Sequence, residues 1–147
     1  MKQPSEERIR LFQEKQFPLI RQDQWDSWKW QLQHRMTATD LEKFLSVSGV
    51  YSPSTVRNAD QRFPVSITPY YLGLIGGTTL EKTILPHSEE HIDQEDELTD
   101  PLLEINDSPL PTLIHRYPDR VLFLTTHNCA VYCRYCTRSR MVGDTAQ

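Results

Sequence analysis

The sequence has little cysteine and little glycine, and it has no long apolar run. Three Cys and 5 Gly in 147 residues exclude a disulfide-built secreted domain and a collagen-like chain. No stretch reaches the roughly 18 apolar residues of a membrane span, and the charged beginning MKQPSEERIR lacks the apolar region of a secretory signal. We therefore expect a cytoplasmic protein with no membrane contact.

Basic residues are also missing from one segment. Residues 89–107 contain nine carboxylates and no Lys or Arg, whereas residues 115–141 contain five Arg against one carboxylate, Asp119. The planar guanidinium group matches phosphate and carboxylate in a bidentate manner. The basic segment therefore predicts small anionic ligands, with no nucleic-acid partner, and the acidic run predicts a solvated, flexible face.

Capping residues and helical spacing predict helices in residues 1–77. The predicted helix starts are Ser5, Asp23, Thr39, Ser52 and Thr68. The predicted stops are Pro18, Gly49 and the pair Gly76 and Gly77. Trp25, Trp28 and Leu32 recur at helical spacing, which predicts an aromatic stripe that docks the second helix on a core.

The remaining chain predicts a connector and one strand. Residues 78–114 hold four prolines and the acidic run without periodicity, so we expect a long, mostly irregular connector. Residues 121–125, VLFLT, are the only run that predicts a strand, and we expect it to be buried on both faces in a parallel sheet. We thus expect an α/β fold with a helical region at 1–77, the connector at 78–114, and a strand and loop at 115–147.

The cysteines directly follow the predicted strand in the pattern CxxxCxxC, with Tyr135 before the last one. They are Cys129, Cys133 and Cys136. One loop of this spacing can wrap three thiolates around a cuboidal 4Fe–4S cluster and leave one iron open to a ligand. A structural zinc site with His127 as fourth ligand is the alternative. Arg134 and Tyr135 inside the loop fit either packing and solvation or contact with a ligand.

The loop and its neighbours carry a family resemblance. CxxxCxxC with an aromatic residue before the third cysteine, after the first strand of an α/β unit, resembles the radical S-adenosylmethionine superfamily. The neighbouring segments resemble the lysine 2,3-aminomutase family: DQWDSWKWQ at 23–31, ITPYY at 67–71, DSP at 107–109, HRYPDR at 115–120 and CTRSR at 136–140. The resemblance implies a partial (β/α) barrel, of which this chain would hold the amino-terminal helices, the first strand and the cluster loop, with most of the barrel missing.

The resemblance also implies cofactors and residue roles. The cluster would bind and cleave S-adenosylmethionine, and Arg116, Tyr117 and Arg120 would bind the phosphate of pyridoxal 5'-phosphate. Arg138 matches the arginine that meets the substrate carboxylate. Ser139 stands where the family usually has another arginine, which leaves the amino-acid substrate open. No catalytic residue is assigned.

The activity implied is a 2,3-aminomutase that converts L-lysine to β-lysine. Glutamate, or a lysine of a translation factor, is the alternative substrate, and the tryptophan-rich segment at 23–31 favours a free amino acid. An iron–sulfur or zinc-binding module without enzymatic activity is the alternative of another class. We expect an electron donor of the flavodoxin or ferredoxin type and a homo-oligomer at full length. The glycine-rich segment and the cofactor lysine of the family are absent, so we expect an amino-terminal fragment that is inactive alone.

Overall fold

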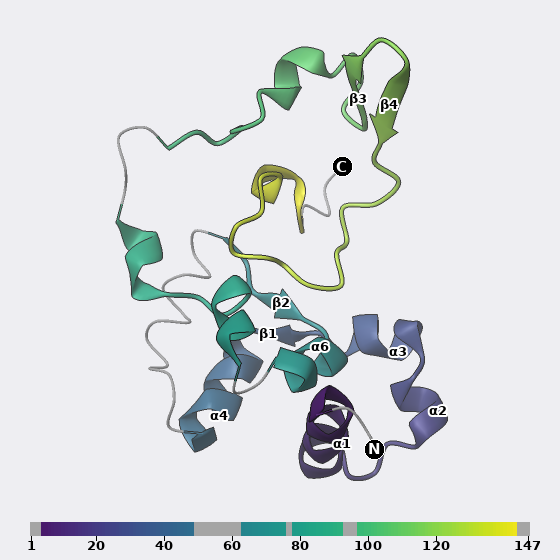
Figure 1. Ribbon diagram of the computed structural model, residues 1–147, viewed down its shortest axis with the longest axis vertical. Coiled ribbons are helices and arrows are strands. Elements are labelled where there is room, and N and C mark those ends of the chain that lie inside the picture. Colours follow the sequence, from purple (N-terminus) through teal and green to yellow (C-terminus); the bar gives the residue numbers. More distant parts are fainter. Residues whose placement is uncertain (1–3, 49–62, 76–77, 93–96, 144–147) are drawn as a thin grey trace. The chain divides into compact units, whose positions relative to one another are not determined.

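The computed structural model describes residues 4–48, 63–75, 78–92 and 97–143, and Figure 1 shows its helices and strands. The chain divides into two units, which we describe separately. Unit 1 comprises Met1–His91 and Ala130–Arg134, and unit 2 comprises Ile92–Cys129 and Tyr135–Gln147. The chain therefore changes unit twice within the cysteine pattern.

Helices make up most of unit 1. They are α1 (Pro4–Gln16), α2 (Gln22–Trp25), α3 (Trp28–Gln33), α4 (Ala38–Ser48) and α6 (Pro69–Ile75). Helix α1 ends before Pro18 as predicted, but it begins at Pro4, so the predicted start residue Ser5 lies inside it. The prediction of α6, which begins at Pro69 directly after Thr68, is confirmed. Proline suits the first helical position because its missing N–H would have no partner there. The helix predicted to start at Ser52 lies outside the described residues.

The prediction of one continuous second helix is wrong. Asp23 lies inside α2, and the chain breaks before α3, where the Ser27 hydroxyl accepts a hydrogen bond from the Trp30 N–H at 3.5 Å. Serine in this position satisfies a backbone donor at a new helix start. The break turns the two tryptophans apart, so that Trp25 is 1% exposed and Trp28 is 67% exposed. Only one of them belongs to the core.

The third predicted helix exists, but its cap is different. Helix α4 begins at Ala38, so Thr39 lies inside it. The Asp40 carboxylate accepts hydrogen bonds from the backbone N–H and the hydroxyl of Thr37, at 3.0 and 2.9 Å. A carboxylate in the first turn satisfies free donors and favours the positive end of the helix dipole. Thr37 and Asp40 therefore take the place of the predicted pair, Thr39 and Glu42.

The core of unit 1 surrounds a small sheet. Strand β1 (Met36–Thr37) pairs antiparallel with β2 (Ser66–Ile67), and Val131 forms a bridge to Ile67 on the other side. The buried apolar cluster is Ala38, Leu41, Val65, Ile67, Leu72, Ile75, Ile84 and Leu85. Helices α1 and α6 pack closely because Gly73 carries no side chain; a Cβ there would lie 3.1 Å from the Phe12 ring. Burial of this apolar surface is the main stabilising contribution in unit 1.

Unit 2 is built around a hairpin. Strand β3 (Leu113–Tyr117) pairs antiparallel with β4 (Arg120–Phe123) (Figure 1). The predicted strand is therefore present, but the prediction that it is buried on both faces in a parallel sheet is wrong, because every residue of β4 is exposed. Within the described part of the chain, the only strand that pairs with β4 is β3. The chain thus has the expected mixture of helix and strand, and the barrel stays a prediction.

The described residues of the predicted connector include three short 3₁₀ helices. They are η1 (Thr79–Thr83), η2 (Ser88–His91) and η3 (Glu104–Asp107). Ile84, Leu85 and Pro86 after η1 are buried in the core of unit 1. A further 3₁₀ helix, η4 (Ser139–Met141), follows the last cysteine. In the described ranges, no helix has both the length and the apolar character needed to cross a membrane.

Candidate functional site

None of the three cysteines forms a disulfide, and none is buried in the core. Cys129 is exposed, and Cys133 and Cys136 are partly exposed. Accessible thiolates are the ligands that iron–sulfur clusters require, so the donor set fits such a group chemically. Cys133 belongs to unit 1, and the other two belong to unit 2. Among the described residues, no three side chains of Cys, His, Asp or Glu form a ready-made metal group.

The backbone around Cys133 is fixed to unit 1. The Tyr132 N–H donates to the Ser66 carbonyl at 2.9 Å, and the Arg134 N–H donates to the Thr83 carbonyl at 2.8 Å. The Tyr132 ring is buried, and its centroid lies 6.1 Å from that of Phe63. Both neighbours of Cys133 are thus held by hydrogen bonds to segments distant in sequence.

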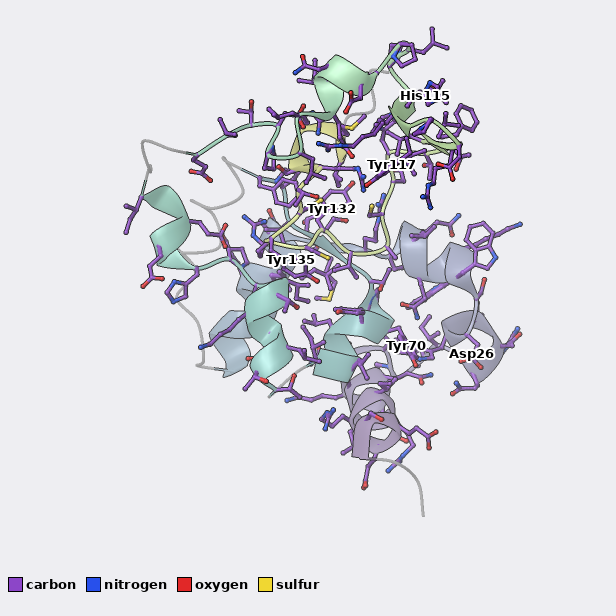
Figure 2. All side chains as sticks on the ribbon, turned by 45° about the horizontal axis from the view of Figure 1, so that its top comes forward. Asp26, Tyr70, His115, Tyr117, Tyr132 and Tyr135 are labelled. Atoms are coloured by element: carbon purple, nitrogen blue, oxygen red, sulfur yellow. The ribbon has the colours of Figure 1, made fainter. Side chains whose placement is uncertain are left out.

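Arg134 is an anchor of this loop. Its side chain is 6% exposed, and its Nε and Nη2 atoms donate to the Glu90 carboxylate, with Nε contacts of 3.2 and 3.1 Å. Nη1 donates to the carbonyls of Phe63 and Pro64 at 3.0 and 3.3 Å, and the guanidinium carbon lies 5.0 Å from the Phe63 ring centroid. Each side-chain nitrogen therefore has a protein partner. The packing interpretation of Arg134 therefore accounts for its contacts. The side chain of Tyr135, in contrast, is 71% exposed (Figure 2).

Two buried carboxylates hold the arginines after Cys136 in unit 2. Arg138 Nε lies 3.1 and 3.0 Å from the two oxygens of Glu104, and Nη2 lies 2.5 Å from Oε1. Arg140 Nη2 lies 3.3 Å from Asp100 Oδ1 and 3.6 Å from Glu104 Oε2. Asp100 and Glu104 come from the acidic run, so the prediction that this run is a solvated face is wrong for both. Burial is tolerated because each carboxylate faces a guanidinium.

These contacts change the pKa values of two groups. Burial by itself would raise the pKa of Asp100, but backbone hydrogen bonds from Ile105 and Glu104 and the charges of Arg140 and Arg116 together lower it. The hydrogen bond to Glu104 raises the pKa of Arg138 against the opposing effect of burial, and the charges of Glu104 and Cys136 add to the rise. Asp100 is therefore ionised and Arg138 is protonated at neutral pH.

The predicted phosphate-binding residues lie on the hairpin, two together and one apart. Tyr117 pairs with Arg120 across the strands, and the Arg120 guanidinium carbon lies 5.0 Å from the Tyr117 ring centroid. Arg116 instead donates through Nη1 to the Leu102 carbonyl at 2.6 Å, with Nε 3.7 Å from Asp107. All three side chains are exposed, and Figure 2 labels Tyr117 on the hairpin. Tyr117 and Arg120 thus lie together on the hairpin, with Arg120 Nε 3.2 Å from Asp119 Oδ1.

His127 forms hydrogen bonds that join the two ends of the segment containing the cysteines. Its Nδ1 lies 2.8 Å from the Met141 carbonyl oxygen, and the Gly143 N–H donates to its own carbonyl at 3.2 Å. Because a carbonyl oxygen only accepts, the imidazole carries its proton on Nδ1 in this contact. In the neutral ring, this tautomer leaves the lone pair on Nε2, which is the atom that the zinc alternative would use.

Sequence reasoning missed Glu90, Asp100 and Glu104 as partners of the loop arginines. A signal was available, because nine carboxylates without a basic residue precede five arginines with one carboxylate. That imbalance favours pairing between the two segments. It does not say which carboxylate meets which arginine.

Several curated proteins are similar to the chain over most of its length. The L-lysine 2,3-aminomutase of Fusobacterium nucleatum is 39% identical over 133 residues, and that of Bacillus subtilis is 42% identical over 130 residues. The glutamate 2,3-aminomutase of Clostridioides difficile is 35% identical over 127 residues. These alignments cover 87%, 85% and 84% of this chain, but the chain spans only 31%, 27% and 30% of the respective relatives. No protein-family model matches the chain.

Proposed function

Because the chain belongs to the lysine 2,3-aminomutase family over the stretch it shares with these relatives, we propose that it forms the cluster-binding and anion-binding part of an amino-acid 2,3-aminomutase. The similarity over more than four fifths of the chain carries the proposal. The enzyme acts on a free amino acid, and L-lysine is the substrate. L-lysine is favoured over glutamate by identity, 39% and 42% against 35%.

The cysteines hold a 4Fe–4S cluster in this proposal. Their solvent exposure and the absence of a disulfide among them support it, since a cluster must reach them without unfolding a core. When bound, the cluster with S-adenosylmethionine supplies the radical that removes a hydrogen atom, and pyridoxal phosphate supplies the carrier for the migrating nitrogen. The protein's part is to bind, orient and shield these groups. Arg134 contributes by fixing the backbone beside Cys133.

Charged side chains of unit 2 bind the anionic groups. Tyr117 and Arg120 offer a phenol and a guanidinium to the phosphate of pyridoxal phosphate, and Arg116 joins them if it leaves Leu102 and Asp107. Arg138 binds the substrate carboxylate. Its exposed fraction of 38% supports this role, because an external carboxylate can reach it. An electron donor of the flavodoxin or ferredoxin type completes the proposal.

Anaerobic reconstitution with iron and sulfide tests the proposal. The full chain, its Cys133→Ala variant and a Ser139→Ala control are reduced and compared by electron paramagnetic resonance, with and without S-adenosylmethionine. We expect a four-iron signal that the nucleoside alters in the chain and in the control, and no such signal in Cys133→Ala. Stoichiometric zinc uptake without a cluster would instead favour a structural metal module.

A further inference from the structure

The guanidinium group of Arg138 is occupied on only one of its edges. A guanidinium has a side edge, Nε with one Nη, and an end edge formed by the two Nη atoms, and each can bind a carboxylate in a bidentate manner. Glu104 takes the side edge through Nε and Nη2. Nη1 of Arg138 makes no hydrogen bond to the described residues. The end edge is therefore available to a second carboxylate.

Glu104 is held firmly enough to orient its partner. Its residue is 3% exposed, and Arg138 approaches both of its carboxylate oxygens. Its backbone carbonyl accepts the Ser108 hydroxyl at 2.6 Å, at the end of η3. The preceding residue, Leu103, has φ 53°, a left-handed conformation that a leucine adopts only at an energetic cost. The backbone of Glu104 is thus held within η3 by contacts that do not involve Arg138.

The guanidinium of Arg140 also lies close to the Glu104 carboxylate. Arg140 Nη2 lies 3.6 Å from Glu104 Oε2 and 3.3 Å from Asp100 Oδ1, while Arg140 Nη1 is buried without a hydrogen-bond partner among the described residues. Two guanidinium groups near each other repel, and a carboxylate between them lowers that repulsion. Glu104 therefore allows Arg138 to stay in place although Arg140 is close.

We propose that Glu104 is a positioning residue, which holds the Arg138 guanidinium by its side edge so that the end edge accepts the carboxylate of the amino-acid substrate. The inference rests on the proposed function for the identity of that ligand. Glu104 and the ligand bind Arg138 at the same time, since they use different edges. Glu104 is thus no competitor that the substrate has to displace.

Arginine-detected NMR of the full wild-type chain tests whether both carboxylates bind together. Without ligand, we expect the Arg138 Nε–H proton to exchange slowly with water, whereas that of Arg120, whose side chain is 70% exposed, exchanges fast. Titration with L-lysine, and separately with acetate, should shift the Arg138 Nη signals while the protected Nε–H signal remains. Loss of that signal at saturation would mean that the ligand displaces Glu104, which overturns the proposal.

Two variants separate orientation from stability. Glu104→Gln should weaken L-lysine and acetate binding at Arg138 by about tenfold to a hundredfold, the scale on which a misplaced binding group acts. Asp100→Asn removes the charge of a second buried carboxylate, which contacts Arg140 and not Arg138, and keeps an oxygen that can accept the Ile105 N–H, so binding should weaken less than about threefold. Equal losses in the two variants would overturn the positioning role. If Glu104→Gln does not fold, the wild-type titration alone decides.

The two probes distinguish this inference from the proposed function. Acetate binding that depends on Glu104, without any binding of L-lysine, would support the positioning role and contradict the proposed substrate. L-lysine binding at Arg138 that is unchanged in Glu104→Gln would leave the proposed substrate in place and overturn the positioning role. Absence of any shift at Arg138 with either probe would overturn the positioning role as well.

Discussion

Unit 1 and unit 2 are stabilised by different interactions. In unit 1, eight buried apolar residues form one contiguous cluster around the β1–β2 sheet. In the described part of unit 2, Ile114 is the only buried apolar side chain, and the other buried residues are Asp100 and Glu104. Unit 1 thus depends on the hydrophobic effect, and unit 2 depends on ion pairs and backbone hydrogen bonds.

This difference coincides with the distribution of the predicted functions. The arginines assigned to anions all lie in unit 2, and the anchor beside Cys133 lies in unit 1. Arginines used for binding need neighbouring carboxylates and access to solvent, which leaves little room for an apolar core. A region with few buried apolar contacts opens more easily than a packed one. We therefore expect acid and salt to affect unit 2 before unit 1.

The largest effect is expected from the ion pair of Arg134 and Glu90, because it lies in unit 1, where apolar burial otherwise dominates. Arg134→Ala removes the guanidinium beside Glu90 and its hydrogen bonds to the Phe63 and Pro64 carbonyls, so the free energy of unfolding of unit 1 should fall by about 3 to 5 kcal/mol. Urea denaturation followed by the fluorescence of buried Trp25 measures this change. Arg10→Ala, which breaks the exposed pair with Glu14, should cost less than about 1 kcal/mol. Similar small losses in both variants would mean that the Arg134 contacts contribute little.

The apolar cluster of unit 1 gives the next largest effect. Ile67→Ala removes a fully buried side chain beside the β1–β2 pairing, so unit 1 should lose about 3 kcal/mol of stability. The same urea experiment applies, with Leu19→Ala as control because Leu19 is 92% exposed. A loss of less than about 1 kcal/mol would indicate that the core repacks around the cavity.

A smaller difference between the two units is expected at low pH, where unit 2 should lose stability first. The pKa of Asp100 is lower in the folded chain than in the unfolded chain, so its stabilising contribution is complete above the unfolded value of about 3.9 and is lost as pH falls through the folded value. Amide signals of residues 98–107 should broaden or shift below about pH 4, before those of residues 65–75. In Asp100→Asn this pH dependence should disappear; its persistence would assign it to another carboxylate.

The smallest expected effect has the opposite sign. Leu103 adopts φ 53° and is more than half exposed, so Leu103→Gly should remove strain with little loss of burial and stabilise unit 2 by about 1 kcal/mol. Ile105→Gly is the matched control within η3, and it should destabilise by about 0.5 to 1 kcal/mol. Hydrogen exchange of the η3 amides measures both changes. Destabilisation by Leu103→Gly would show that its side chain matters more than its backbone.

Local signals in the sequence predicted local structure well. Pro18 after α1, and Thr68 with Pro69 at the start of α6, act on the residues beside them, and both predictions are confirmed. The second helix failed at Ser27, because helical spacing of tryptophans continues across a break that a single capping hydroxyl creates. Helical periodicity predicts which residues would share one face of a helix, but it does not predict where a capping residue starts a new helix.

Pairing between distant segments could not be predicted in the same way. The run VLFLT reads as a buried strand because apolar β-formers suit that environment, but burial depends on neighbours, and the described neighbour is the antiparallel β3. Glu90 with Arg134 and Glu104 with Arg138 join residues 44 and 34 positions apart. The charge imbalance favours such pairs in general, but the acidic run was predicted to be a solvated face, and only the fold selects the partners.

The contact between His127 and Met141 bears on the assembly of a cluster. Together with the Gly143 N–H bound to the His127 carbonyl, it joins the two ends of the stretch that contains all three cysteines. Closing a loop costs configurational entropy, and a loop whose ends already meet has lost part of that freedom before any ligand arrives. If the three cysteines hold the proposed cluster, the His127 contact would lower the entropic cost of binding it.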